Sequence, residues 1–455
     1  MKFRRLTFCL SWICLLTAYA AAQERPAAKL TIEEAVRFGL DHNKNLAADR
    51  GQIAEALGRL KQAGLKANPM VESAGLASIN NTGMQNLSVG VTLPLEVGRR
   101  VRRITLADHE VARMRNEVAD RERMLSAEIR MKFAEALETR QKLELTQQIV
   151  RLDQEILGLI RARVEEGVSA RVEENMQTIE LRRVEARASA LASQFRVGLE
   201  ELKGLLGWPT GANGPTGANG STGANGPTGA VDDLDALQVG GELPVAFPEV
   251  TSKELPELIA LARQNRPDLQ AALTSETIGE SMIEMARAEG RFDLSIFGEL
   301  GWQRWGFDQM AEMNGRLVPI GMQNGMLKAG VNIMLPVRNR NQGNIEAAAA
   351  WRQSARLRRE FIESIVHREA TAAAEKLRGA AIVLRTFDNQ LIESQEKNYQ
   401  ILRTSFELGH ARLGDLLAEQ RRLVELKMEQ TEARRELLLA AIELARAING
   451  PLAVR

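Results

Sequence analysis

The chain has 455 residues, with 60 Lys and Arg against 59 Asp and Glu, so its formal net charge is +1. This balance offers no surplus of positive charge, and no nucleic-acid partner is expected. Aromatic residues make up only 4%, and the many Ala, Leu, Glu and Arg residues are typical of long helices that pack on other helices.

Residues 1–22 have the pattern of a signal peptide. A basic start precedes an apolar run from Phe8 to Thr17, and small residues follow where cleavage would occur. The alternative is an uncleaved membrane anchor, for which the run is shorter than the roughly 20 residues that a spanning helix needs. Both cysteines, Cys9 and Cys14, lie in this segment. We therefore expect neither a disulfide nor a thiolate metal site in the mature chain.

Residues 23–209 form the first of two repeats. An amphipathic helix is predicted for residues 32–66, and two β-type segments follow it. A helix over residues 99–166 would then extend about 100 Å at 1.5 Å per residue. Gly167 ends it, and a return helix is predicted for residues 170–206.

Residues 210–250 separate the repeats. Gly recurs at every third position from Gly211 to Gly229. The pattern resembles a short collagen array, and a flexible Gly-rich linker is the alternative. No Gly-Lys-Ser/Thr follows, so a phosphate-binding loop is excluded.

Residues 251–455 repeat the same plan. The expected order is a helix over 252–288, two β-type segments, a long helix over 340–408 ended by a glycine, and a return helix over 412–448. Alone, such helices would leave an apolar stripe in water, so we expect them to pack as coiled coils. A fibrous coiled coil is disfavoured because β-type segments interrupt both halves at matching places.

The β-type segments predict a sheet with one apolar and one polar face. They cover about Pro69–Ile79, Leu87–Leu95, Phe292–Trp302 and Leu327–Leu335, and most of them alternate with period two. A length of about 9–11 residues suits a tilted membrane strand, although a buried half-sandwich would alternate likewise. Glu72 fits poorly in the first segment if it faces lipid.

Four strands per chain cannot close a barrel. Open edges inside a membrane leave backbone groups unsatisfied at several kcal/mol each, so several copies must each supply a share. Three copies would give twelve strands, an even number within the known range. The connections at about residues 80–86 and 303–326 would be outer loops.

Several short motifs recur at the strand exits and helix turns. Leu93-Pro94-Leu95 and Leu335-Pro336-Val337 precede the two long helices, and residues 406–417 read Phe-Glu-Leu-Gly-His-Ala-Arg-Leu-Gly-Asp-Leu-Leu. With the duplicated plan, these motifs resemble the TolC-like outer-membrane efflux protein family. Residues 335–343 look like the corresponding stretch of its cobalt-zinc-cadmium efflux branch.

The resemblance implies a mixed α and β fold. A homotrimer would form an outer-membrane β-barrel, with four strands per chain, continued by a long periplasmic α-helical barrel. It would conduct substrate passively, without a cofactor, from an inner-membrane pump and a periplasmic adaptor. The adaptor would dock at the helix tips, namely Gly167, Val168, Ser169, Gly409, His410, Ala411 and Arg412.

The resemblance also points to a constriction near the second tip. Asp415 matches the first of two acidic positions in the family's pore, whereas the second is Ala418 here, with Glu419 beside it. A ring of carboxylates would favour cations. The alternative is an acid that merely suits a helix N-terminus, and Glu173, its counterpart in the first half, is expected to be such a surface charge.

No other motif predicts chemistry. The chain contains no serine elbow and no dinucleotide fingerprint, so no enzyme activity is expected. Clustered methionines in the longer outer loop could bind Cu(I), but loop methionine is more often filler, and the four histidines lack zinc-ligand spacing. Heavy-metal cations are the expected cargo. Export of drugs by the same architecture and a periplasmic coiled-coil scaffold are the alternatives.

Overall fold

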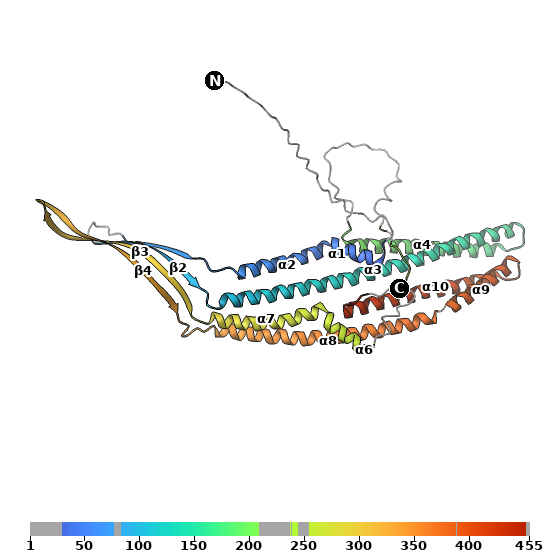
Figure 1. Cartoon of the computed structure of the whole chain (residues 1–455). Coiled ribbons are helices and arrows are strands. Elements are labelled where there is room, and N and C mark those ends of the chain that lie inside the picture. Colours follow the sequence, from blue (N-terminus) through green and yellow to red (C-terminus); the bar gives the residue numbers. More distant parts are fainter. Residues whose placement is uncertain are drawn as a thin grey trace, which may run out of the picture.

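The computed structural model describes residues 30–76, 83–208, 237, 239–243, 254–387 and 389–451. The expected signal peptide and the Gly-triplet array lie outside these residues. The molecule is elongated, with the sheet at one end and, at the other end, the two turns that connect the long helices to the return helices (Figure 1). In chain order the elements are α1 (Ile32–His42), α2 (Lys44–Ala63), β1 (Met70–Leu76), β2 (Gly83–Leu95), α3 (Arg99–Glu165), α4 (Arg171–Leu206), α6 (Leu255–Asn265), α7 (Pro267–Glu289), β3 (Asp293–Met313), β4 (Arg316–Met334), α8 (Gln342–Thr386), α9 (Asn389–Glu407) and α10 (Leu413–Ile448).

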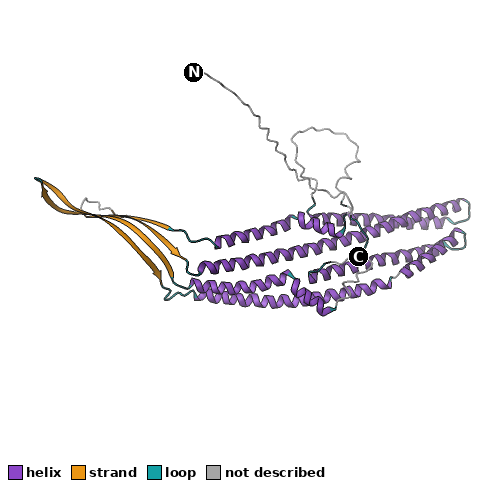
Figure 2. Ribbon diagram, viewed as in Figure 1, coloured by secondary structure: helices purple, strands orange, loops and turns teal. Residues whose placement is uncertain are grey.

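The duplicated plan is present in the structure. Each half has two short helices, two strands, a long helical stretch and a return helix (Figure 2). The bounds of α3, α4 and α10 fall within one residue of those expected. Gly207 and Asn449 end the return helices in the left-handed conformation, which caps a helix C-terminus.

Both opening helices are broken where one continuous helix was expected. Asn43 and Arg266 are extended, with φ of −66° and −71°. Asn43 also caps α2, because its side chain accepts a hydrogen bond from the Leu46 N–H at 3.0 Å. Pro267 causes the second break, since the residue before a proline is disfavoured in the helical region.

The second long helix is also broken, at Phe387, so the expected continuous helix over residues 340–408 is wrong. Phe387 has φ −93° and ψ 48° and packs against the main core. The Gln430 side chain of α10 donates to the Phe387 carbonyl at 3.1 Å. A tertiary contact therefore satisfies a carbonyl that the break releases, and local sequence could not reveal it.

The sheet is antiparallel in the order β1-β2-β3-β4, so β1 and β4 are its edges. Directly opposed residues share a face. One face carries the cross-strand rows Leu95–Leu294–Ile333, Leu93–Ile296–Val331, Val91–Gly298–Ala329 and Val89–Leu300–Leu327.

The opposite face of the sheet is more polar, although Phe297 and Met326 also lie on it. Glu72, Gly90, Glu299 and Lys328 form one of its rows, and Lys328 pairs with Glu299 at 3.5 Å. Glu72 therefore lies on the polar face, which removes the difficulty noted for the first strand.

The expected outer loop at residues 303–326 is wrong. β3 and β4 continue through it to a two-residue turn, Asn314-Gly315, with Met313 opposite Arg316. The φ angles of Asn314 and Gly315 are 58° and 74°, as a type I′ hairpin turn requires. The Asn-Gly pair was the sequence signal for this turn.

Two apolar cores hold the helices together. The larger joins both halves through α1, α3, α4, α6, α8 and α10, and it also includes Leu237, Val239 and Leu243. These three residues fall within the span expected to be insert and linker, so that part of the linker is packed. A smaller core near the helical turns contains Ile156, Ile160, Tyr399, Phe406, Leu413, Leu416 and Leu417.

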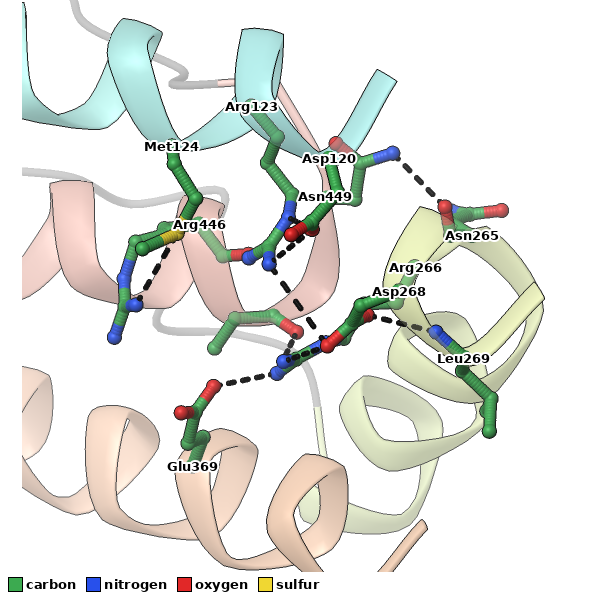
Figure 3. Close-up of polar contacts among 11 residues, drawn as sticks. Asp120, Arg123, Met124, Asn265, Arg266, Asp268, Leu269, Glu369, Arg446 and Asn449 are labelled. Atoms are coloured by element: carbon green, nitrogen blue, oxygen red, sulfur yellow. Dashed lines mark hydrogen bonds and ion pairs between the residues drawn. The ribbon is translucent and has the colours of Figure 1, made fainter. Parts of the chain in front are cut away.

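A buried ion cluster joins the two halves at mid-length (Figure 3). Arg266 is 2% exposed; it donates to both carboxylate oxygens of Asp268 and, at 2.6 Å, to Glu369 of α8. Burial disfavours the charged Arg266, but the hydrogen bonds that it donates to Asp268 and Glu369 outweigh this effect and hold the Arg266 pKa above its usual value. Arg123 of α3 donates to Asp120 and to the Arg446 carbonyl.

Within the described residues, no helix combines the length and apolar character needed to cross a membrane.

Candidate functional site: the paired helix tips

The two turns at the helical end have the same backbone hydrogen bonds. In the first, the N–H groups of Val168 and Ser169 donate to the Arg163 carbonyl; in the second, those of His410 and Ala411 donate to the Ser405 carbonyl. Gly167 and Gly409 have φ of +76° and +82°, a conformation that favours glycine. The structure thus builds all the expected tip residues into two matched turns, which we call the helix tips.

The tips present apolar side chains to solvent. Val168 is 73% exposed and Leu408 is 68% exposed, and Val172 in the first turn of α4 is also exposed. Exposed aliphatic residues beside glycine turns form a surface that another protein could cover.

Arg163 links the two tips, and the sequence analysis missed it. Its guanidinium donates to the carbonyls of Phe406 at 3.1 Å and Glu407 at 2.5 Å, and it lies 5.1 Å from the Phe406 ring centroid. A cation at the C-terminal carbonyls of α9 is favourable for the helix dipole and for the aromatic ring. A lone basic residue in an apolar stripe was the available signal.

Asp415 lies exposed in the first turn of α10. Among the described residues it has no ion-pair partner. Glu419 is half-buried and engaged: it accepts a hydrogen bond from Gln395 of α9 at 2.8 Å and pairs with Arg422 at 3.2 Å. The two expected constriction residues therefore differ, since only Asp415 has its carboxylate free of such partners. Glu173 is half-buried in the first turn of α4.

A buried polar cluster lies a few turns from the tips. Asp153 of α3 is fully buried, and its carboxylate accepts a hydrogen bond from Gln420 of α10 at 2.9 Å. Gln177 of α4 donates to the Asp153 backbone carbonyl at 3.2 Å. Burial raises the Asp153 pKa, only partly offset by these amides. The side-chain oxygens of Gln177 and Gln420 lack donors among the described residues, and the single O–H of a protonated Asp153 could donate to one of them.

Metal ligands do not gather in the described part of the chain. No group of three His, Cys, Asp or Glu residues there could hold a metal ion. The methionines of the expected outer loop lie instead on β3 and β4, with Met322 opposite Trp305 and Met310 opposite Pro319. Met310, Met313 and Met322 are exposed on these strands.

Comparisons with known proteins agree with this architecture. A cobalt-zinc-cadmium resistance protein, CzcC of Cupriavidus metallidurans, is 22% identical over 430 residues, or 93% of this chain and 91% of that protein. The crystal structure of CusC matches with a TM-score of 0.65 and 15% identity, over 92% of both chains. The outer membrane protein VceC of Vibrio cholerae gives 0.65 and 15%, over 92% of this chain and 96% of that one.

A protein-family model also matches most of the chain. The family model described as outer membrane efflux protein covers residues 35–208 and 258–450, which include both helix tips and all four strands. This chain belongs to the outer membrane efflux protein family.

Proposed function

We propose that three copies of this chain form one passive duct across the outer membrane, which receives substrate from a periplasmic adaptor and an inner-membrane pump. The observation that carries the proposal is the open sheet. Its edges β1 and β4 have no further strand partner among the described residues, and its apolar face is exposed. Joining copies edge to edge satisfies the backbone groups and turns the apolar face toward lipid.

Fractionation tests this arrangement. The expected result is protein in outer-membrane fractions that migrates as a trimer on gels and becomes a monomer after heating. Purely soluble protein would instead support the periplasmic scaffold.

The same proposal assigns adaptor docking to the helix tips. The two tips share one backbone geometry and expose Val168 and Leu408, so an adaptor hairpin could meet both with similar contacts. Replacing Val168 with Asp should weaken crosslinking to the adaptor. Replacing Val197, an exposed residue far along α4, should not.

Asp415 is the acidic residue we place at the periplasmic constriction, with Glu419 contributing less because Gln395 and Arg422 already engage it. Three Asp415 carboxylates in a narrow pore would attract cations. We expect Asp415→Ala to weaken block of single-channel current by a trivalent cation several-fold, while the matched Glu173→Ala leaves block unchanged. Equal behaviour of the two variants would remove Asp415 from the constriction.

Heavy-metal cations are the cargo we propose, supported by the cobalt-zinc-cadmium resistance relative. Growth of a deletion strain on cobalt, zinc and cadmium salts, and separately on organic antibiotics, tests this. Sensitivity to the metals alone supports the proposal. Sensitivity to the antibiotics alone supports drug export through the same duct.

A further inference from the structure

In the described part of the chain, the junction between sheet and helices carries several cations that form no ion pair with a carboxylate. Here α2 and α7 end, and α3 and α8 begin (Figure 1). Arg99, Arg102 and Arg103 each pair with a carboxylate, namely Asp293, Glu284 and Glu96. Five further cations have no carboxylate partner among the described residues. We call these five the junction belt: Lys66, Arg100, Arg291, Arg338 and Arg340.

Hydrogen bonds hold the belt together. The Arg99 guanidinium donates to the Arg291 carbonyl at 2.8 Å, and Arg100 donates to the Gly64 carbonyl at the end of α2 at 2.7 Å. Asn341, next to Arg340, donates to the Ala286 carbonyl of α7 at 2.9 Å. Three segments distant in sequence are therefore fixed at one level of the molecule.

An exposed apolar residue is the sequence neighbour of four of the five belt cations. Leu65 precedes Lys66, Val101 follows Arg100, Phe292 follows Arg291 and Val337 precedes Arg338; all four apolar residues are exposed. An aliphatic or aromatic side chain beside a cation is the pattern of a membrane boundary, where the first enters the acyl region and the second meets headgroups.

The belt continues the apolar face of the sheet. On β3 that face runs from Leu294 to Trp302, about 27 Å at roughly 3.4 Å per residue, and such a band fits a bilayer core when tilted. Beyond Trp302 the next row is polar, with Gln85, Arg304 and Gln323. The helix-side limit of the band is the junction belt.

We propose that the junction belt binds the phosphates of anionic phospholipids in the leaflet that faces the helices. Its surplus of positive charge complements phosphate, and guanidinium groups suit phosphate oxygens. The N-termini of α3 and α8 add partial positive charge at the same level. The inference depends on the outer-membrane placement of the family and not on the identity of the cargo.

The test uses the full assembled protein in nanodiscs that contain phosphatidylglycerol and phosphatidylcholine. Native mass spectrometry measures which lipid is retained. The variant is Arg291→Gln with Arg338→Gln and Arg340→Gln. Its matched control removes three exposed arginines on distant helices, Arg171, Arg196 and Arg385. Because each cation near a membrane surface contributes appreciably, the junction variant should lose its phosphatidylglycerol preference by roughly tenfold or more, and the control should retain it.

Three outcomes would overturn the proposal. The first is unchanged phosphatidylglycerol retention in the junction variant. The second is an altered ion selectivity of the channel with unchanged retention, which would place these arginines along the pore. The third is equal competition by inorganic phosphate, which would indicate a free-phosphate site. If the variant fails to assemble, the wild-type protein still tests the proposal. It should dissociate at a higher temperature in phosphatidylglycerol than in phosphatidylcholine, and equal temperatures would contradict lipid binding by the belt.

Discussion

Asn43 in the first half and Arg266 in the second stand at the same kind of helix break, with nearly the same backbone angles. Asn43 satisfies its amide with backbone groups alone: it accepts from the Leu46 N–H and donates to the Leu205 carbonyl of α4. Arg266 buries a full charge and needs carboxylates from α7 and α8. The duplicated backbone therefore places different chemistry at matching positions.

The helical end shows the same asymmetry. Arg163 reaches across to α9, whereas its counterpart Ser405 makes no such link. Asp153 is a buried acid, while Gln395 at the matching place is a neutral amide that donates to Glu419. These differences lie where the two halves contact each other. Two identical repeats would place identical groups opposite each other there, and such groups would not complement one another.

The largest expected loss of stability comes from substitution in the buried ion cluster around Arg266. Arg266→Ala leaves Glu369 without its cation and leaves Asp268 with only Arg123, at 4.0 Å, and breaking a buried pair costs about 3–5 kcal/mol. Asn43→Ala removes a helix cap, worth about 1 kcal/mol. Heat or urea dissociation of the assembled protein measures both. Arg263→Ala, an exposed site on α6, is the control, and similar losses at Asn43 and Arg266 would contradict the contrast.

Arg163→Ala should cause the next largest loss of stability. It removes two charge-assisted hydrogen bonds at a partly exposed site, about 1.5–3 kcal/mol in total after allowing for solvent. Because the tips lose their link, the mean conductance of the resting channel should rise. Ser405→Ala keeps that link and should conduct like the wild type. A resting conductance unchanged by Arg163→Ala would show that the link does not restrain the tips.

Sequence patterns predicted what repeats along the chain, and failed where distant segments interact. The bounds of α3 follow from an unbroken helical pattern ended by Gly167, and the two faces of the sheet follow from alternation. The break at Phe387 depends on Gln430 and on packing against the core. The burial of Asp153 requires α4 and α10 together, so no pattern within α3 could distinguish it from a surface acid.

The hairpin beyond Trp302 is a different kind of failure. Its signal, Asn314-Gly315, lay in the sequence, but Gly and polar residues scattered through residues 303–326 obscured the alternation. The expected constriction residues illustrate a further limit. The family motif pointed to Asp415 and to Ala418, with Glu419 beside it, and only side-chain contacts separated the free carboxylate from the engaged one.

Asp153→Asn should change how stability depends on pH. Burial raises the Asp153 pKa, so the folded chain holds a proton that the unfolded chain loses near pH 4. The stability from the protonated form is complete below that unfolded pKa and is lost as pH rises through the folded pKa. The Asn variant does not lose stability in this way. Its stability relative to the wild type should therefore rise as pH increases from the unfolded to the folded pKa of Asp153, and the difference should stay constant at higher pH. Glu180 and Arg421, the charged groups that act on the Asp153 pKa, remain in both proteins.

Thermal dissociation at several pH values measures this difference. Asp108→Asn, an exposed acid on the same helix, should leave the pH profile unchanged. Parallel profiles for Asp153→Asn and the wild type would show that Asp153 is ionised in the folded protein throughout.

The smallest expected effect comes from substituting the two glycines whose backbone conformation both halves share. Gly167 and Gly409 both have positive φ, and an added Cβ would meet open space at each. Alanine therefore loses only backbone conformational energy, about 1 kcal/mol at either site. Hydrogen exchange at the Val168 and His410 amides, which close the two turns, should accelerate equally in the Gly167→Ala and Gly409→Ala variants. A much larger change at one turn would mean that the tips differ in backbone as well as in side chains, because open space leaves no steric clash to account for it.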